Sequence, residues 1–293
     1  AAARRASRIR VPRPGPSSTR LTWSGAPIAD RPWTHKRKAL LWASRITLTE
    51  QLLAWLNEQV AALDPLLPRV FGRLPKAPVE IRRVPVSIQG GAPGGYYQGP
   101  PLDGSRPGAY YINLRDTAEW PSWTLPTLSY HEATPGHHHQ IALQQENADT
   151  PMLMKVLGFS AYSEGWGLYA EQLADEMGAY EDDAWGRIGY LQSLMFRAAR
   201  LVVDSGLHAK RWSREQAMEY FRQNSLLSER DIQKEVERYI TNPGQATSYK
   251  IGELKIEELR DKARAALGDR FDIKAFHAVV LGSGSVPLDV LEE

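Results

Sequence analysis

The 293-residue chain contains no cysteine. Disulfides, iron–sulfur clusters and thiolate zinc sites are therefore excluded, and any bound metal would have to be held by histidine, aspartate or glutamate. The chain also lacks a run of about 18 apolar residues, the length that a membrane-spanning helix needs, so we expect no membrane span. Its basic N-terminus is not followed by the apolar stretch and cleavage site of a signal peptide. The sequence leaves the compartment open, whether cytoplasmic, periplasmic or secreted.

Positive charge is concentrated at the N-terminus, although the formal net charge of the whole chain is only +2. Residues 1–45 hold eleven lysines and arginines but one acidic side chain, Asp30, which leaves the remainder with a net charge of −8. Prolines and serines interrupt this stretch, so we interpret it as a disordered or expression-derived tail. A nucleic-acid-binding arm is the alternative, but the acidic remainder disfavours nucleic acid as a partner. Residues 46–293 then form one domain, long enough to bury its own core.

Hydrophobic spacing predicts a mainly helical fold with a small antiparallel β-sheet. The strand-like segments are Val79–Ile88 and Ala109–Leu114, which a glycine- and proline-rich region separates. Helices are predicted over residues 47–63, 125–147, 157–177, 183–206, 213–224, 229–240, 245–265 and 272–280. Ser213, Ser228 and the pair Pro243–Gly244 supply caps and breaks between them.

Four of the seven histidines lie between Tyr130 and Gln140. His131–Glu132 matches the start of the H-E-x-x-H motif, in which two histidines on one helix face bind zinc and the glutamate accepts a proton from water. The position four residues after His131 is, however, occupied by Pro135. The next histidine is six residues on, which places it on a different face of a regular helix.

Proline and glycine break helices, so the pair Pro135–Gly136 can bring a later histidine into the place of the second ligand. If these two residues bulge out of the helix, His137 takes the place that the motif gives to its second histidine. His138 is on the correct face but two turns away, so it remains an alternative ligand, and His139 ranks last. A solvated, histidine-rich surface turn is the competing interpretation.

A second segment, Phe159–Glu171, can complete the site. Glu164 begins a helical run, and a glutamate from a downstream helix completes the two-histidine, one-glutamate ligand set of gluzincins. Such a set leaves the fourth zinc position open to water, which hydrolysis requires. Gly165 and Gly167 weaken a helix and so favour the close approach of another helix. A buried Glu–Trp pair that only packs is the alternative.

The segments His131–Gln140 and Ser163–Glu171 together resemble bacterial domain-of-unknown-function family 885, which is grouped with the H-E-x-x-H metallopeptidases. Further blocks share this likeness, which extends from about residue 47 to about residue 281: Tyr97–Tyr111, Leu201–His208, Trp212–Gln216 and Arg238–Gly252. Members of the family carry a long helical N-terminal half before these blocks, where this chain has only the short basic stretch. The resemblance implies a bacterial, zincin-like helical domain with a gluzincin type of site.

The same resemblance implies a zinc-dependent peptidase that acts on small peptides. His131, His137 and Glu164 would hold Zn²⁺, and Glu132 would be the general base. The alternative is a catalytically inactive metal-binding or scaffold protein of the same fold. The sequence does not distinguish exopeptidase from endopeptidase action, and it does not indicate the oligomeric state.

Four further side chains are candidates for supporting roles. Tyr249, which follows a helix break in a family-like block, is our candidate for a second electrophile that stabilises an oxyanion, with Tyr239 and His208 as rivals. Asp204 and His208 are four residues apart on a helix. They could orient or replace a ligand histidine, or form a surface ion pair.

A strand is the candidate for substrate binding. Residues 108–114 include Tyr110 and Tyr111 and could form an edge strand that binds an extended peptide by strand addition. The alternative is an edge strand that is capped and has no binding role.

Overall fold

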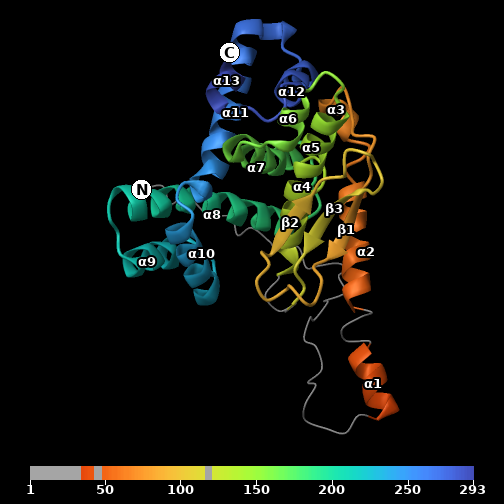
Figure 1. Ribbon diagram of the computed structural model, residues 1–293, viewed down its shortest axis with the longest axis vertical. Coiled ribbons are helices and arrows are strands. Elements are labelled where there is room, and N and C mark those ends of the chain that lie inside the picture. The colour runs from red at the N-terminus through yellow and green to blue at the C-terminus, as the bar shows by residue number, and fades with distance from the viewer. Residues whose placement is uncertain (1–33, 43–47, 116–120) are drawn as a thin grey trace, which may run out of the picture. The chain divides into compact units, whose positions relative to one another are not determined.

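The computed structural model describes residues 34–42, 48–115 and 121–293 (Figure 1). The chain divides into two compact units, Ala1–Leu48 and Thr49–Glu293. In the first unit, helix α1 (His35–Trp42) lies within the stretch that we interpreted as a tail, so that stretch contains regular structure. The greater part of the predicted tail, residues 1–33 and 43–45, lies outside the described residues.

Helices make up most of the second unit, as the hydrophobic spacing predicts, and the mainly helical fold is confirmed. After α1 they are α2 (Leu48–Ala61), α3 (Leu67–Val70), α4 (Leu125–Glu132), α5 (His137–Glu146), α6 (Met152–Val156), α7 (Ser160–Glu176), α8 (Ala184–Ala209), α9 (Arg214–Asn224), α10 (Glu229–Thr241), α11 (Gln245–Leu267), α12 (Ile273–Gly282) and α13 (Leu288–Glu292), with the short 3₁₀ helices η3 (Ser122–Thr124) and η4 (Gly268–Arg270). Within the described ranges, none of these helices is both long and apolar enough to cross a membrane.

Capping residues explain why α9, α10 and α11 begin where they do. Ser213 accepts a hydrogen bond from the backbone N–H of Gln216, whose side chain accepts one in return from the backbone of Ser213. This capping box satisfies two backbone donors that the helix itself leaves free. Ser228 caps α10 by accepting from the N–H of Asp231. Gly244, with φ of 81°, precedes α11 in the left-handed region that favours glycine.

Three short strands form a single mixed sheet. They are β1 (Val79–Arg83), β2 (Gly95–Gln98) and β3 (Gly108–Ile112), in the order β1–β3–β2. β2 and β3 are antiparallel, as expected, but β1 runs parallel to β3. The small sheet is confirmed, while its antiparallel character holds for only one pair of strands. The reason is that β1 and β2 are not neighbours. Residues 84–94 connect them across the sheet, and β3 then pairs between the two strands.

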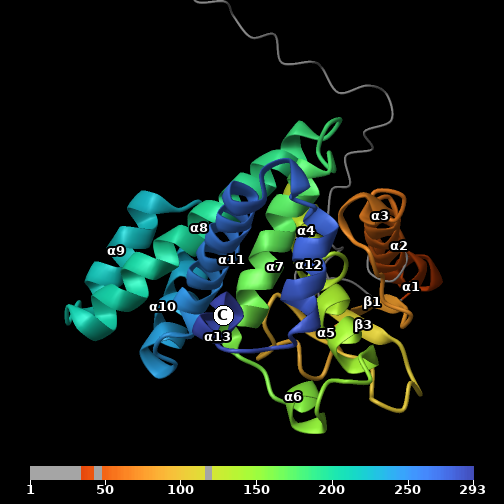
Figure 2. The same ribbon diagram turned by 90° about the horizontal axis from the view of Figure 1, so that it is seen from above.

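Helix α7 has a central place in the second unit, with α11 packed on one side and α4 and α5 on the other (Figures 1 and 2). Helices α4 and α5 in turn contact the sheet. The crossing of α7 and α11 is close, because a Cβ atom on Gly252 would lie 1.8 Å from the carbonyl oxygen of Ala161. Trp166 and Tyr162 of α7 are fully buried in the core beside this crossing. This packing brings residues from α4, α5, α7 and α11 to one place.

Candidate metal centre

The interruption between α4 and α5 decides where the histidines lie. Helix α4 ends at Glu132 and α5 starts at His137, and the backbone N–H of His138 donates to the carbonyl of Ala133 across the break at 3.1 Å. A Cβ atom on Gly136 would lie 1.9 Å from the carbonyl oxygen of His131, so the bulge requires glycine there. The predicted bulge is confirmed, and the sequence pair Pro135–Gly136 is its cause.

The bulge brings two histidines and one glutamate together. Nε2 of His131 lies 3.4 Å from Oε2 of Glu164, and Nε2 of His137 lies 3.3 Å from the same oxygen. The two imidazole rings are nearly perpendicular, with centroids 4.7 Å apart. In the part of the chain that the structure describes, these residues form the one group of three or more His, Asp or Glu side chains that could hold a metal ion, with ligand atoms within 4.8 Å of one another.

The two distances to Glu164 are compatible with a tetrahedral metal site. Tetrahedral ligands at the usual bond lengths of about 2.0–2.2 Å lie about 3.3–3.6 Å from one another, close to the two separations found here. All three side chains are buried or half-buried. Two imidazole nitrogens and a carboxylate oxygen are a donor set that zinc prefers and that hard cations such as magnesium do not.

The electrostatics of the group also favour a bound cation. Burial alone would lower the pKa of His131, but hydrogen bonds to the carboxylates of Glu164 and Glu171 outweigh it and raise that pKa to about 9. Burial would raise the pKa of Glu164, yet His131 and His137 hold it well below its usual range. The carboxylates thus stabilise a positive charge in the site. A metal ion can supply that charge in place of a proton.

Glu171 is a functional residue that sequence reasoning missed. It is fully buried, and its carboxylate accepts a hydrogen bond from Nδ1 of His131 at 2.9 Å. Because Nδ1 is the donor in this contact, Nε2 of His131 is the nitrogen left to face Glu164. The hydroxyls of Thr127 and Ser193 also donate to Glu171 and fix its position. A signal was present, since Glu164 and Glu171 are seven residues apart and so share one face of a helix.

Two further contacts hold the histidines in place from α7. A Cβ atom on Gly167 would lie 2.6 Å from Cε1 of His131, so glycine leaves the room that this imidazole occupies. The indole N–H of Trp166 donates to the carbonyl of Pro135 at 3.0 Å and ties the bulge to α7. Gly167 and Trp166 therefore help to position the histidines through their packing. The sequence had suggested a close approach for this glycine and packing for the tryptophan.

Glu132, the predicted general base, lies at the same centre. Its side chain is buried, and burial raises its pKa, while the side chains of His137, His131 and Arg197 oppose this shift. A carboxylate whose affinity for a proton is increased in this way is better suited to accept one from water.

Tyr249, the candidate for the electrophile role, lies beside His131. Its ring stacks on that of His131, with a centroid distance of 6.1 Å and an angle of 21°. Burial raises the pKa of Tyr249, so the hydroxyl keeps its proton at neutral pH. Tyr239, in contrast, donates its hydroxyl to Glu235 at 2.8 Å and is fully buried.

His208 and Asp204 contact a helix junction instead of the three ligands. Nε2 of His208 lies 2.9 Å from the carbonyl oxygen of Tyr239 and 3.7 Å from Oδ1 of Asp204. Asp204 accepts a hydrogen bond from the backbone N–H of Gly244 at 3.0 Å. The pair thus attaches the junction of α10 and α11 to α8, and it positions the helix that carries Tyr249.

His138 is not available as a metal ligand, so the prediction that held it as an alternative is wrong. Its Nε2 lies 3.0 Å from the carbonyl of Ala77, which can only accept, so that nitrogen carries the proton. Its Nδ1 therefore accepts from the hydroxyl of Tyr97 at 2.9 Å. Burial lowers the pKa of His138 to about 4. His139 is fully buried, and its ring centroid lies 4.1 Å from that of Phe71.

The expectation of an open edge at Tyr110 and Tyr111 is wrong. Both residues lie on β3, which is the central strand because β1 and β2 pair on its two sides. Its backbone groups are therefore used within the sheet and cannot accept a peptide by strand addition. Tyr110 is also fully buried, and Tyr111 stacks on Tyr96 with ring centroids 5.0 Å apart.

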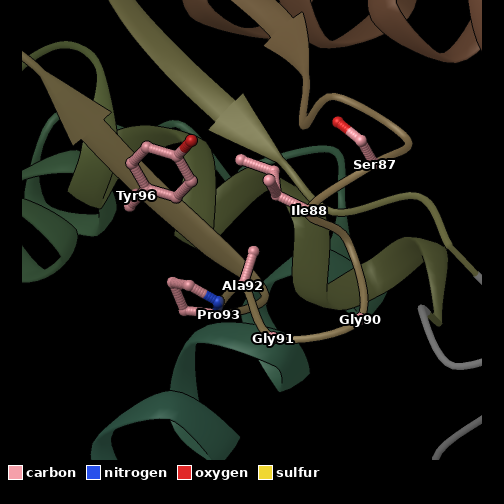
Figure 3. Close-up of a pocket in the computed structure, with 7 residues that line it drawn as sticks. All are labelled: Ser87, Ile88, Gly90, Gly91, Ala92, Pro93 and Tyr96. Atoms are coloured by element: carbon pink, nitrogen blue, oxygen red, sulfur yellow. The ribbon is translucent and has the colours of Figure 1, made fainter.

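A separate surface hollow of about 610 Å³ lies at the turn before β2 and beside Tyr96 (Figure 3). The residues that line it are Ser87, Ile88, Gly90, Gly91, Ala92, Pro93 and Tyr96. None of them is a histidine or an acid, so the hollow offers shape and apolar contact without the groups that hydrolysis needs.

With this geometry established, the chain can be compared with known proteins. A family model described as "Bacterial protein of unknown function (DUF885)" matches residues 31–293. The chain belongs to this family. The resemblance to domain-of-unknown-function family 885 is thereby confirmed, whereas the relationship to metallopeptidases stays a prediction. No curated protein matches the chain.

Two solved structures are similar to this member of the family. One is described as "the putative lipoprotein from Colwellia psychrerythraea", with 50% sequence identity and a TM-score of 0.82 over 84% of this chain and 42% of that one. The other is "a putative lipoprotein of unknown function from Shewanella oneidensis", with 23% identity and a TM-score of 0.70 over 82% of this chain and 44% of the other. The second likeness shows the fold alone. The chain thus spans less than half the length of both relatives.

Proposed function

We propose that this protein is a zinc-dependent peptidase of the zincin type. The observation that carries the proposal is the convergence of His131, His137 and Glu164, with the acid Glu132 directly after the first of these ligands. The carboxylate of Glu171 behind His131 adds support, because ligand histidines usually donate their second N–H to such a group.

The roles of the residues follow from their chemistry. His131, His137 and Glu164 would hold the ion, which leaves a fourth position without a protein ligand. A bound zinc ion supplies Lewis acidity, which lowers the pKa of water and polarises a carbonyl oxygen. Glu132 accepts a proton from the attacking water and passes it to the amine nitrogen that leaves. Tyr249 donates a hydrogen bond from its hydroxyl to the oxyanion.

The relatives support a location outside the cytoplasm. The relative from Colwellia psychrerythraea, which is 50% identical to this chain, is described as a "putative lipoprotein". We infer that this protein, too, acts on the far side of the inner membrane of a bacterium. Fractionation of cells that express the native gene would place it in the periplasmic, membrane or secreted fraction, and recovery in the cytoplasm alone would contradict the inference.

The proposal is tested by comparing the wild-type protein with the Glu132→Gln variant. Both are supplied with zinc, dialysed, and assayed for metal content and for hydrolysis of a mixture of short peptides by mass spectrometry. We expect one retained zinc ion in each protein and turnover in the wild type only, reduced roughly 10²–10⁴-fold or more in the variant. Zinc retained without turnover in either protein would instead favour an inactive, metal-binding member of the family.

A further inference from the structure

Two arginines of α8, Arg197 and Arg200, lie beside the proposed centre. Arg197 and Arg200 both contact the ring of Tyr249, with guanidinium carbons 5.9 Å and 4.7 Å from its centroid. Because Tyr249 itself stacks on His131, these two arginines lie one side chain away from a metal ligand.

The carboxylates nearby do not use all of the donors of these arginines. Arg200 donates to Glu235 at 2.9 Å, but Arg238 shares the same carboxylate oxygen at 2.9 Å. Arg197 donates to the hydroxyl of Ser193 and lies 3.8 Å from Glu171, beyond hydrogen-bond distance. Glu171 already accepts from three other side chains.

Several donor atoms are therefore left over. In the described ranges of the chain, Nε of Arg197 and both Nε and Nη1 of Arg200 are buried and make no hydrogen bond to another group of the protein. Buried donors without an acceptor are costly, because they have lost their water without gaining a partner. The side chain of Arg200 is 8% exposed and that of Arg197 is 14% exposed, so a ligand can reach Arg197 first.

A carboxylate is the ligand that best satisfies such donors, since the planar guanidinium matches its two oxygens and both charges strengthen the hydrogen bonds. Every peptide with an unblocked C-terminus carries a carboxylate there. That group lies one residue, about 3.5 Å of extended chain, beyond the last peptide bond. Arg197 lies against Tyr249 and 3.8 Å from Glu171, and both of these residues contact His131, so a carboxylate bound to Arg197 would lie close to the proposed centre.

We propose that Arg197, backed by Arg200, binds a carboxylate of the peptide substrate and makes the protein prefer peptides that are cleaved next to their free C-terminus. This inference rests on the proposed peptidase function. It names a substrate class, small peptides with an unblocked α-carboxylate, and a specificity-determining residue. A structural role is the competing explanation, in which Arg197 only balances the charge of Glu171.

The test measures binding separately from turnover. The full chain with Glu132→Gln, loaded with zinc, is titrated in a calorimeter with an N-acetylated tripeptide as its free acid and as its C-terminal amide. Two further amides, with glutamate or glutamine as the last residue, show whether an acidic side chain can supply the carboxylate instead. We expect the free acid to bind roughly 10–100-fold more tightly than the amide.

Adding Arg197→Gln should abolish this difference by weakening the binding of the acid while leaving the amide unchanged. Arg187→Gln is the matched control, because Arg187 lies on the same helix in an exposed ion pair with Asp175. Zinc content is measured for each variant. Tighter binding of the glutamate-ended amide than of its glutamine counterpart, without a preference for the free acid, would show that Arg197 binds an acidic side chain and would overturn the assignment to the α-carboxylate.

Equal affinity for acid and amide in the parent protein, or equal weakening of both by Arg197→Gln, would overturn the proposal. Loss of zinc from Arg197→Gln with an unchanged acid-to-amide ratio would do so as well, since it indicates the structural role. Hydrolysis of the same peptides by the wild type is assayed in parallel. A preference for acids without hydrolysis would refute the peptidase function alone, and hydrolysis without the preference would refute this inference alone.

Discussion

Glu171 accepts a hydrogen bond from Nδ1 of His131 at 2.9 Å, and this contact leaves Nε2 of the same ring directed towards Glu164. The orientation of a proposed metal ligand is thus set by a carboxylate that no substrate can reach, because Glu171 is fully buried.

Glu171→Gln is expected to lower the affinity for zinc roughly 10–100-fold, as is usual when the group behind a ligand histidine is altered. Competition with a chelator of known affinity measures this change. Glu176→Gln is the control, since Glu176 lies on the same helix but pairs with Arg260 at its surface. An unchanged zinc affinity in Glu171→Gln would show that this contact does not serve the metal.

The neighbouring residues His137 and His138 offer a direct comparison of a ligand with a structural histidine. His137→Gln should lose more zinc affinity than the roughly 10–100-fold that a supporting group contributes. His138→Gln should keep that affinity, because both nitrogens of His138 face Tyr97 and Ala77. The same chelator titration distinguishes them, and a loss confined to His138→Gln would reverse our assignment.

Gly167→Ala should impair the site through sterics alone. The added Cβ atom would lie 2.6 Å from Cε1 of His131, so the imidazole has to move away from Glu164. We expect weaker zinc binding and slower peptide hydrolysis. Gly282→Ala is the control, because its Cβ atom would meet no atom within 4 Å. If zinc binding by Gly167→Ala matches that of the control, the proposed ring position of His131 is incorrect.

His277 predicts how stability depends on pH. Burial lowers the pKa of His277 to about 4, even though its Nδ1 donates to the carbonyl of Val70. The unfolded chain, with a histidine pKa of about 6.5, binds this proton more readily. Stability is therefore complete above about pH 6.5 and falls as the pH decreases towards 4, by at most roughly 3 kcal/mol from this group.

His277→Asn keeps a donor for Val70 and removes the titrating ring. The slope of the unfolding free energy against pH, between about pH 6.5 and 4, should be smaller in the variant. The decrease corresponds to at most one bound proton. Urea unfolding at a series of pH values measures this slope. His138 and His139 have pKa values lowered in the same direction, so part of the slope remains in the variant. A slope identical to that of the wild type would show that His277 does not titrate in this range.

The sequence predicted most of the helices because apolar spacing and capping residues such as Ser213 and Ser228 act locally. The break at Pro135–Gly136 was predictable for the same reason. The parallel pairing of β1 with β3 was not, since strand order depends on how residues 84–94 cross the sheet. It was this order that placed Tyr110 and Tyr111 on a central strand.

The three candidate ligands could be selected from the spacing of the motif, whereas the surroundings of the site could not. Whether His138 points to a metal or to Ala77 depends on β-sheet packing far away in the sequence. Glu171 was within reach of a periodicity argument, but its three donors come from two other helices, α4 and α8. Arg197 has no motif and is recognised only by its distance from Tyr249.

The most direct test of the account is to locate the metal itself. Crystals of the zinc-loaded protein are measured with X-rays on both sides of the zinc absorption edge, which reveals zinc by its anomalous scattering. We predict one strong peak, about 2.0–2.2 Å from Nε2 of His131, Nε2 of His137 and a carboxylate oxygen of Glu164. Absence of a peak among these three residues, or a peak bound to other side chains, would contradict the account.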